Sequence, residues 1–320
     1  MGRRITAKAT RDERAKQRRT LGRLRDQRVK PSVHTRYLKA VGRFLLWAAA
    51  CEVPYAASLP ELDQQLAWYL EALWQQGDAK SLAGDTLSGA QHLLLQKRCF
   101  HTAWGLYGTW SLLEMPARVP PLTSHLVLAL SGLAMKIQRP DYAMMLLLMF
   151  HCLLRPSEAW ALTPEMVSIN AAHRGVLALP LTKSGLRKGA QEMVTIDDPM
   201  VGKLTAALLA RRSPGERLML GSPHQFRAYL KGGLAAMGLQ GLRYTAYSLR
   251  RGGATHDFMA HQDVARTVMR GRWGDLKTAR ICITDGLAVQ TQLQLTTTQR
   301  ETANAYRTVF LQLMRGWLAV

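Results

Sequence analysis

The sequence predicts a mainly α-helical protein of two domains that carries one small antiparallel β-sheet. Three observations lead to this prediction. Apolar residues recur at helical spacing over most of the chain, one short stretch alternates like two strands joined by a turn, and a proline-rich segment divides the chain. With 320 residues, of which 48% are hydrophobic, the chain is long enough to form two separate cores.

The first 30 residues are expected to form a basic arm. They contain twelve Lys and Arg residues against three acids, and almost no large apolar side chains. Such a segment cannot build a core of its own. We expect either a disordered segment or a solvated helix that becomes ordered on a polyanion, and its Arg-rich patch is also typical of a nuclear-localisation signal.

Residues 31–117 are predicted to form a helical domain. Apolar side chains within 37–48 and within 62–74 each fall on one helical face, and a third helix is expected over residues 86–108. Three or four helices of this kind make a small α domain. Residues 114–123 contain three prolines in ten residues, which is typical of a linker.

Residues 118–320 are predicted to form a second domain, helical except for one hairpin. Strands are expected at 176–181 and 192–196, joined by a turn rich in Gly and Lys. The apolar run 142–154 is too short to span a bilayer, which favours a buried helix. Further helices are expected from about residue 200 onward, and Tyr306 lies in the apolar stripe of the last one.

The charge of the chain favours a polyanionic partner. The formal net charge is +21, and residues 121–320 alone carry twenty-four basic residues against twelve acids. Basic side chains that contact phosphates release condensed counterions, so nucleic acid is the partner class that this charge indicates. We expect no membrane partner, because no basic amphipathic helix with a wide apolar face is present. Charge that serves solubility alone is the remaining alternative.

The cysteines give no sign of a disulfide framework or a metal site. Cys51, Cys99, Cys152 and Cys282 show no paired spacing and no CxxC motif. We therefore expect free thiols, an intracellular location and no bound metal. The sequence also lacks the glycine-rich motifs that cradle nucleotide phosphates.

Two motifs in the middle of the second domain carry candidate functional residues. "LLRPSEAWAL" places Arg155 at the end of the apolar run, with Glu158 three residues later. An arginine at the edge of a core needs either a carboxylate partner or an anion. "LTKSG" places Lys183 at the tip of the expected hairpin, and Arg187 and Lys188 follow in the same turn.

Two later motifs complete the set. "YSLRRGGATHDF" places Tyr247, Arg250 and Arg251 at the start of an expected helix, followed by two glycines that permit close backbone approach. "GRWGDLKTARICITDG" then supplies a further arginine, a tryptophan and a cysteine, namely Arg272, Trp273 and Cys282.

Taken in this order, the motifs resemble those of the tyrosine recombinases, the phage-integrase family. The resemblance extends over residues 31 to about 290, and "YSLRRGGATH" is also similar to recombinases of eukaryotic mobile elements. It implies a helical core-binding domain, a linker, and a mostly helical catalytic domain with a small sheet. It further implies double-stranded DNA as the partner, assembly as a tetramer on paired sites, and a nuclear location if the source is eukaryotic.

The resemblance implies DNA strand exchange without a metal or nucleotide cofactor. In this family a tyrosine attacks the scissile phosphate and forms a 3′-phosphotyrosine. Arg155 and Arg250 would hold the non-bridging oxygens, Lys183 would protonate the departing 5′-oxygen, and Trp273 would donate its indole N–H. Glu158 would support the first arginine. Further DNA contacts are expected from four basic residues, Arg187, Lys188, Arg251 and Arg272.

The chain departs from the family pattern at two positions. Tyr247 stands where the family usually has histidine, and a phenol with a pKa near 10 is a poor base at neutral pH. Cys282 stands in the register of the nucleophilic tyrosine. Its side chain is much shorter, and a displacement of about 1 Å can already cost about a hundredfold in rate. We therefore expect Cys282 to be an inert replacement, and Tyr306 to be a core residue.

The function expected from the sequence is DNA binding with site-specific recombination or integration, in which cleavage by Cys282 is doubtful. The alternative is a domesticated or decayed relative that binds DNA and no longer cuts it. An RNA-binding or purely structural basic protein is a third, weaker alternative.

Overall fold

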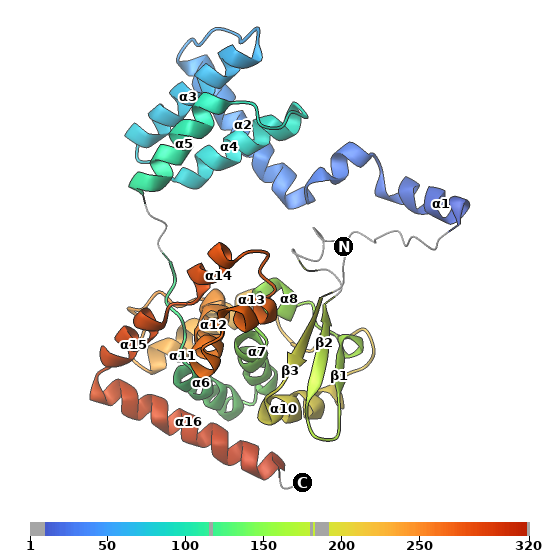
Figure 1. The fold of residues 1–320 in the computed structure, drawn as a ribbon, viewed down its shortest axis with the longest axis vertical. Helices are drawn as coiled ribbons and strands as arrows, with labels where there is room; N and C mark the ends of the chain where they lie inside the picture. The colour runs from blue at the N-terminus through green and yellow to red at the C-terminus, as the bar shows by residue number, and fades with distance from the viewer. Residues whose placement is uncertain (1–9, 115–117, 180–181, 183–191, 319–320) are drawn as a thin grey trace. The chain divides into compact units, whose positions relative to one another are not determined.

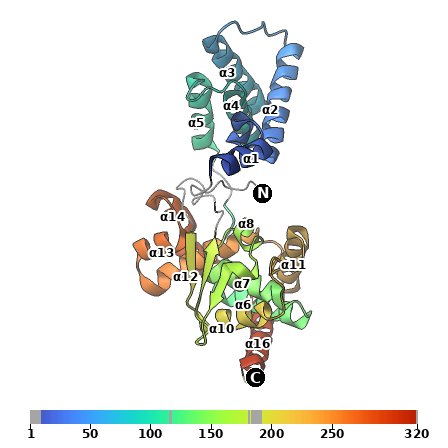
Figure 2. The same ribbon diagram turned by 90° about the vertical axis from the view of Figure 1, so that its right-hand side faces the viewer.

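The structure is a computed structural model that describes residues 10–114, 118–179, 182 and 192–318. The chain divides into two compact units, Met1–Ala117 and Arg118–Val320, and each has its own hydrophobic core. Figures 1 and 2 show the elements of each unit from two directions. None of the helices in the described residues has the length and apolar character needed to cross a membrane.

The first unit is helical throughout its described elements. Phe44, Leu66, Leu87 and Phe100 lie at the centre of its core. Its first helix buries no residue and begins with a capping box between Thr10 and Glu13, so it is a solvated helix. The elements are α1 (Arg11–Leu21), the 3₁₀ helix η1 (Leu24–Arg28), α2 (Pro31–Ala50), α3 (Leu59–Gln75), α4 (Lys80–Leu93) and α5 (His101–Leu113).

The helix expected over residues 86–108 is interrupted, so that prediction is wrong. Between α4 and α5 the chain leaves the helical conformation, and Leu95, Arg98 and Phe100 adopt positive φ. The turn lets Phe100 enter the core, while the carboxylate of Asp63 in α3 accepts the backbone N–H groups of Thr102 and Ala103. This long-range cap replaces the hydrogen bonds that a continuous helix would make, and sequence periodicity does not show it.

The second unit is built around one fully buried helix, α7. Every residue from Asp141 to Phe150 in this helix is buried, which explains the uninterrupted apolar run. Figure 1 shows α7 surrounded by other helices on one side and by the sheet on the other. The helices of the unit are α6 (Ser124–Lys136), α7 (Pro140–His151), α8 (Pro156–Ala159), α10 (Pro199–Leu209), α11 (Pro223–Ala236), α12 (Ala246–His261), α13 (Val264–Gly271), α14 (Leu276–Cys282), α15 (Asp285–Leu293) and α16 (Thr297–Leu318), with a 3₁₀ turn η2 (Pro164–Met166).

The described strands form a three-stranded antiparallel sheet in the order β1-β2-β3. The two expected strands pair as β2 (Gly175–Leu179) and β3 (Glu192–Ile196), with Leu177 opposite Val194. The sequence did not predict β1 (Val167–Ile169), which is only three residues long. The predicted fold class, mainly α with one small antiparallel sheet, is confirmed.

The last helix packs along α6. Phe310 is fully buried, and Tyr306 is partly buried against the same core. The carbonyl of Tyr306 lies so close to Gly132 that a side chain on that glycine would collide with it. Figure 1 shows that α16 runs along one side of the second unit and α14 lies on the opposite side.

Candidate active site

The first candidate residue, Arg155, is held at the N-terminus of α8 by Glu158. One carboxylate oxygen of Glu158 accepts the backbone N–H of Arg155 at 2.9 Å, and the other accepts Nη1 at 2.5 Å. The side chain of Arg155 keeps 23% of its surface exposed, whereas Glu158 is buried. One face of this cation therefore remains available to an anion from solvent.

Arg250 is the largest fully buried side chain of the described residues, and its charge lies inside the second unit. Its guanidinium donates to the carbonyl of Leu153 and, at 2.5 Å, to the carbonyl of Gly271. Leu153 has a positive φ of 48°, an uncommon conformation for leucine that is found in the short turn between α7 and α8. Nε of Arg250 has no hydrogen-bond partner among the described atoms.

The burial of Arg250 has an electrostatic cost. Desolvation, reinforced by the charges of Arg155 and Arg272, lowers the pKa of Arg250 to about 10. The group stays protonated at neutral pH, and its Cζ lies 4.7 Å from the ring centroid of Trp273. A partly unpaired buried cation next to a second arginine is a strong attractor for a phosphate oxygen.

The two glycines after Arg251 allow α12 to approach the centre of the unit. A Cβ on Gly252 would lie 1.8 Å from the carbonyl oxygen of Leu122, and one on Gly253 would lie 1.9 Å from that of Phe150. The close approach expected at these glycines is thus present in the structure. It brings Arg250 on α12 against the end of α7, where Leu153 and Arg155 follow.

Arg251 and Arg272 are both buried, although we expected them to contact DNA. Arg251 donates from Nη1 to the carbonyl of Val119 at 2.5 Å. Arg272 donates from Nη2 to Glu158 at 2.6 Å, and its Nε lies 3.3 Å from the carboxylate of Glu192 at the start of β3. Their guanidiniums bind carbonyl and carboxylate groups inside the protein, so we include neither residue among the phosphate contacts proposed below.

Glu158 and Glu192 connect the site to the sheet. Glu158 bridges Arg155 and Arg272, and Glu192 brings the beginning of β3 next to Arg272. The sequence did not predict the ion pair of Glu192 with Arg272, because a single acidic residue at the start of a strand does not indicate its partner. The other hairpin residues that we expected at the site, Lys183, Arg187 and Lys188, lie outside the described residues.

Trp273 and Cys282 belong to one small apolar cluster beside Arg250. The cluster also contains Leu153 and Ala254, and both Trp273 and Cys282 are buried. Thr255 of α12 fixes the end of α14, because its hydroxyl donates to the carbonyl of Cys282 at 3.3 Å and accepts the N–H of Thr284 at 3.1 Å. Cys282, at the position where the resemblance implies the nucleophilic tyrosine, is thus held next to Arg250.

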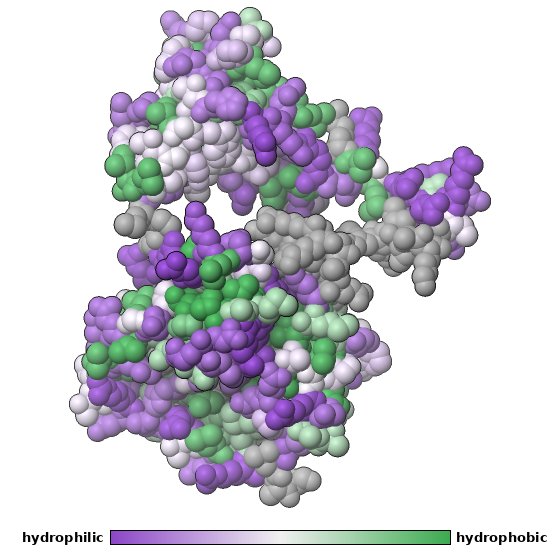
Figure 3. Space-filling view, viewed as in Figure 1, coloured by the Kyte–Doolittle hydropathy of each residue, from purple (hydrophilic) through white to green (hydrophobic). Residues whose placement is uncertain are grey.

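The thiol of Cys282 faces inward. Only 2% of the residue is exposed, whereas Leu276 and Ile281 of the same helix are exposed at the surface. Figure 3 shows apolar side chains gathered in the region of α13 and α14, within a largely hydrophilic surface. An inward thiol on a short helix has little access to a phosphodiester of a duplex.

Tyr247 brings a hydroxyl to this thiol. Its phenolic oxygen lies 3.7 Å from Sγ of Cys282, and 39% of the tyrosine is exposed. Burial raises the pKa of Tyr247, and the neighbouring Cys282 raises it further, while the charges of Arg250 and Arg155 act in the opposite direction. The sequence placed Tyr247 near the site, but gave no sign that it would touch Cys282.

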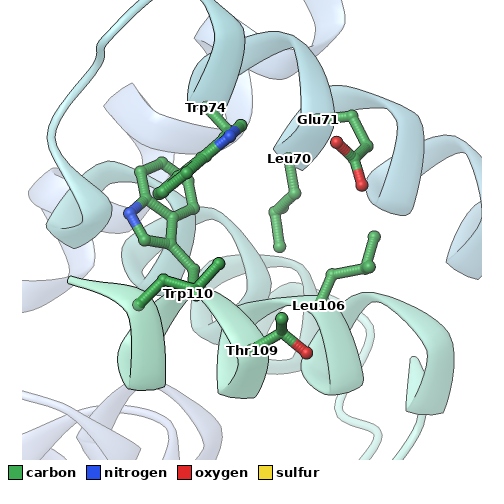
Figure 4. A pocket seen from close by; sticks show the side chains of 7 residues that line it. Leu70, Glu71, Trp74, Leu106, Thr109 and Trp110 are labelled. Atoms are coloured by element: carbon green, nitrogen blue, oxygen red, sulfur yellow. The ribbon is translucent and has the colours of Figure 1, made fainter.

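The first unit offers a different kind of pocket. A pocket of about 90 Å³ lies between α3 and α5, where the rings of Trp74 and Trp110 pack edge to face at 5.3 Å (Figure 4). Its lining includes one acid, Glu71, and no basic side chain. This pocket does not suit a phosphate, in contrast to the arginine cluster of the second unit.

Comparison with solved structures identifies the fold. No protein-family model matches the chain, and no curated protein sequence matches it. The structure is similar to the XerH site-specific recombinase bound to difH substrate in a pre-cleavage complex, with a TM-score of 0.54 and 11% identity over 82% of this chain and 79% of that chain. It is also similar to the Tn1549 transposon integrase in complex with transposon right end DNA, with a TM-score of 0.55 and 13% identity over 88% of this chain and 98% of that chain. The fold implied by the ordered motifs is confirmed: this chain has the fold of the tyrosine recombinases.

Proposed function

We propose that this protein binds duplex DNA and holds one phosphodiester of the backbone against the partly exposed Arg155, with the buried charge of Arg250 reinforcing the site from behind. The observation that carries the proposal is the fully buried charge of Arg250, which forms no ion pair with a carboxylate among the described residues, beside the partly exposed side chain of Arg155. Burying a cation is unfavourable unless an anion compensates it. A phosphodiester supplies two oxygens that match the forked geometry of arginine.

The charge distribution and the fold support DNA as the source of this phosphodiester. The net charge of +21 favours a polyanion, and the arm contributes basic residues on a helix that buries none of its side chains. The XerH and Tn1549 structures with the same fold are complexes with DNA. We further propose that the reaction of this site is strand transfer of the tyrosine-recombinase type, with four copies of the chain on paired sites.

In that reaction, a phosphodiester is exchanged for a covalent 3′-phospho-enzyme. Arg155 and Arg250 stabilise the negative charge that develops on the non-bridging oxygens, an effect worth on the order of 3 kcal/mol for each donor. The general acid that protonates the departing 5′-oxygen is expected at Lys183. Trp273 packs on Arg250 and keeps its guanidinium in place. No metal or nucleotide is required, because the energy of the broken bond is kept in the new one.

A second candidate function is DNA binding without cleavage. The observation that favours it is the burial of Cys282, which leaves the residue in the nucleophile register without access to the duplex. Both functions share the phosphate site, so binding and cleavage must be measured separately.

Duplex binding tests the proposal that both functions share. We expect the logarithm of the binding constant to fall linearly with the logarithm of the salt concentration, with a slope of about −0.9 for each phosphate contacted. Arg155→Gln is expected to weaken binding by about tenfold, since it removes a charge-assisted contact. The matched control is Arg315→Gln, which changes an exposed arginine on α16. Binding that ignores salt, or equal effects of the two variants, would contradict the proposed site.

A further inference from the structure

We infer that Tyr247, rather than Cys282, is the nucleophile that attacks the scissile phosphate. The inference rests on the proposed function, because it assigns a residue to the strand-transfer step of that site. It gives a specific role to the tyrosine at the position where the resemblance implies histidine, and it provides a route to cleavage that does not use Cys282.

The first argument is position. Tyr247 lies in the first turn of α12, three residues before Arg250, so the two side chains leave neighbouring points of the helix. The phenolic oxygen reaches to within 3.7 Å of Sγ of Cys282. A reactive oxygen therefore stands beside the residue in the nucleophile register, although it comes from a different helix.

The second argument is access. The side chain of Cys282 is buried, whereas 39% of Tyr247 is exposed. A phenol is also much longer than a thiol, and it carries its reactive atom away from the backbone. Of the two residues, only Tyr247 presents part of its side chain to a phosphodiester that enters from solvent.

The third argument is electrostatic. Burial and the neighbouring Cys282 raise the pKa of Tyr247, and the charges of Arg250 and Arg155, together with the positive end of the sixteen-residue helix α12, act against this rise. The same positive charges favour a bound phosphate, so nucleophile and substrate are drawn to the same place.

The step balances without any oxidant or cofactor. The phenolic oxygen of Tyr247 forms a bond to phosphorus, and the bond between phosphorus and the 5′-oxygen breaks. The phenol loses its proton to solvent, and the departing 5′-oxygen takes a proton from solvent. Oxygen is also the better match for phosphorus, which is a hard centre, while sulfur prefers carbon and sulfur.

The experiment uses the full-length chain and a pool of nicked duplexes with random sequence around the nick. A nick beside the cleaved bond lets the short strand leave, so the covalent complex accumulates as an SDS-stable band. We expect adducts from the native chain and from Cys282→Ala, and mass spectrometry should locate the nucleotide on Tyr247. We expect Tyr247→Phe to lower adduct formation by about a thousandfold or more, as loss of a nucleophile does.

Tyr306→Phe is the matched control, because Tyr306 also loses only a hydroxyl but lies on α16 on the opposite side of the unit. It should form adducts like the native chain. Thermal unfolding and duplex binding of Tyr247→Phe should match the native chain, which excludes misfolding as the cause of its loss.

Three results would overturn the inference. An adduct located on Cys282 or elsewhere would do so, as would an adduct that survives in Tyr247→Phe. The third is a native chain that binds duplex with the expected salt dependence but gives no adduct. That last result leaves the DNA-binding proposal intact, whereas a failure to bind duplex overturns the proposed function itself.

Discussion

The two helices that meet at the site, α12 and α14, differ in how deeply they are built into the protein. Ten of the sixteen residues of α12 are buried, whereas α14 has seven residues and buries only Ala279 and Cys282. Arg250, the close glycine contacts and the proposed nucleophile Tyr247 all lie on α12, whereas α14 carries Cys282. The proposed site is therefore tied to the core through α12, and α14 adds only the buried thiol beside it.

The largest effect is expected when the contact between α12 and α7 is broken. Gly253→Val places branched atoms where even a Cβ would lie 1.9 Å from the carbonyl oxygen of Phe150. The helices must separate, and we expect the free energy of unfolding to fall by about 4 kcal/mol. Denaturant unfolding measures this, with Gly274→Ala as the control because that glycine has open space around it. Equal stability of the two variants would mean that α12 is less firmly packed than described.

A smaller effect is expected from the carboxylate behind the arginines. Glu158→Gln removes the negative charge that bridges Arg155 and Arg272. Because a buried cation loses its compensation, we expect a loss of about 3 kcal/mol in unfolding free energy. Glu301→Gln, at an exposed position of α16, serves as the control and should be neutral. If Glu158→Gln left the free energy of unfolding unchanged, the amide would be able to replace the carboxylate.

The pH dependence of adduct formation sharpens the comparison further. Burial and the adjacent Cys282 raise the pKa of Tyr247, so the phenol is mostly protonated at neutral pH. Only the ionised phenol attacks, so the rate should rise with pH by about tenfold per unit between pH 7 and 9. The rate of adduct formation on nicked duplex, followed over this range in the native chain and in Cys282→Ala, provides the measurement. A flat profile in both proteins would speak against an ionising phenol as the attacking group.

The smallest effect is expected on the outer face of α14. Leu276 is 52% exposed, and Leu276→Gln keeps a good helix former at this position. We expect the free energy of unfolding to change by less than about 0.5 kcal/mol. A larger loss in denaturant unfolding would show that α14 contributes more to the core than its burial indicates.

Several features of the site were predictable from the order of residues along the chain. The buried helix before Arg155, the hairpin, and the close approach at Gly252 and Gly253 each follow from a local pattern. The interrupted helix after α4 did not follow, because Asp63 of α3 supplies the cap from 39 residues away. The burial of Arg251 and Arg272 was also not predictable, because the sequence does not show whether an arginine faces solvent or a partner inside the protein.

By itself, the sequence determined the kinds of side chain at the site, their order, the excess of positive charge and the small set of helices and strands. Only the tertiary structure decided that Arg250 is fully buried with an unpaired Nε, and that the hydroxyl of Tyr247 meets the thiol of Cys282 across 35 residues. Periodicity and spacing report on contacts within one helix or hairpin. Contacts between α12 and α14 depend on how helices pack against α7, and that packing is set by the whole core at once.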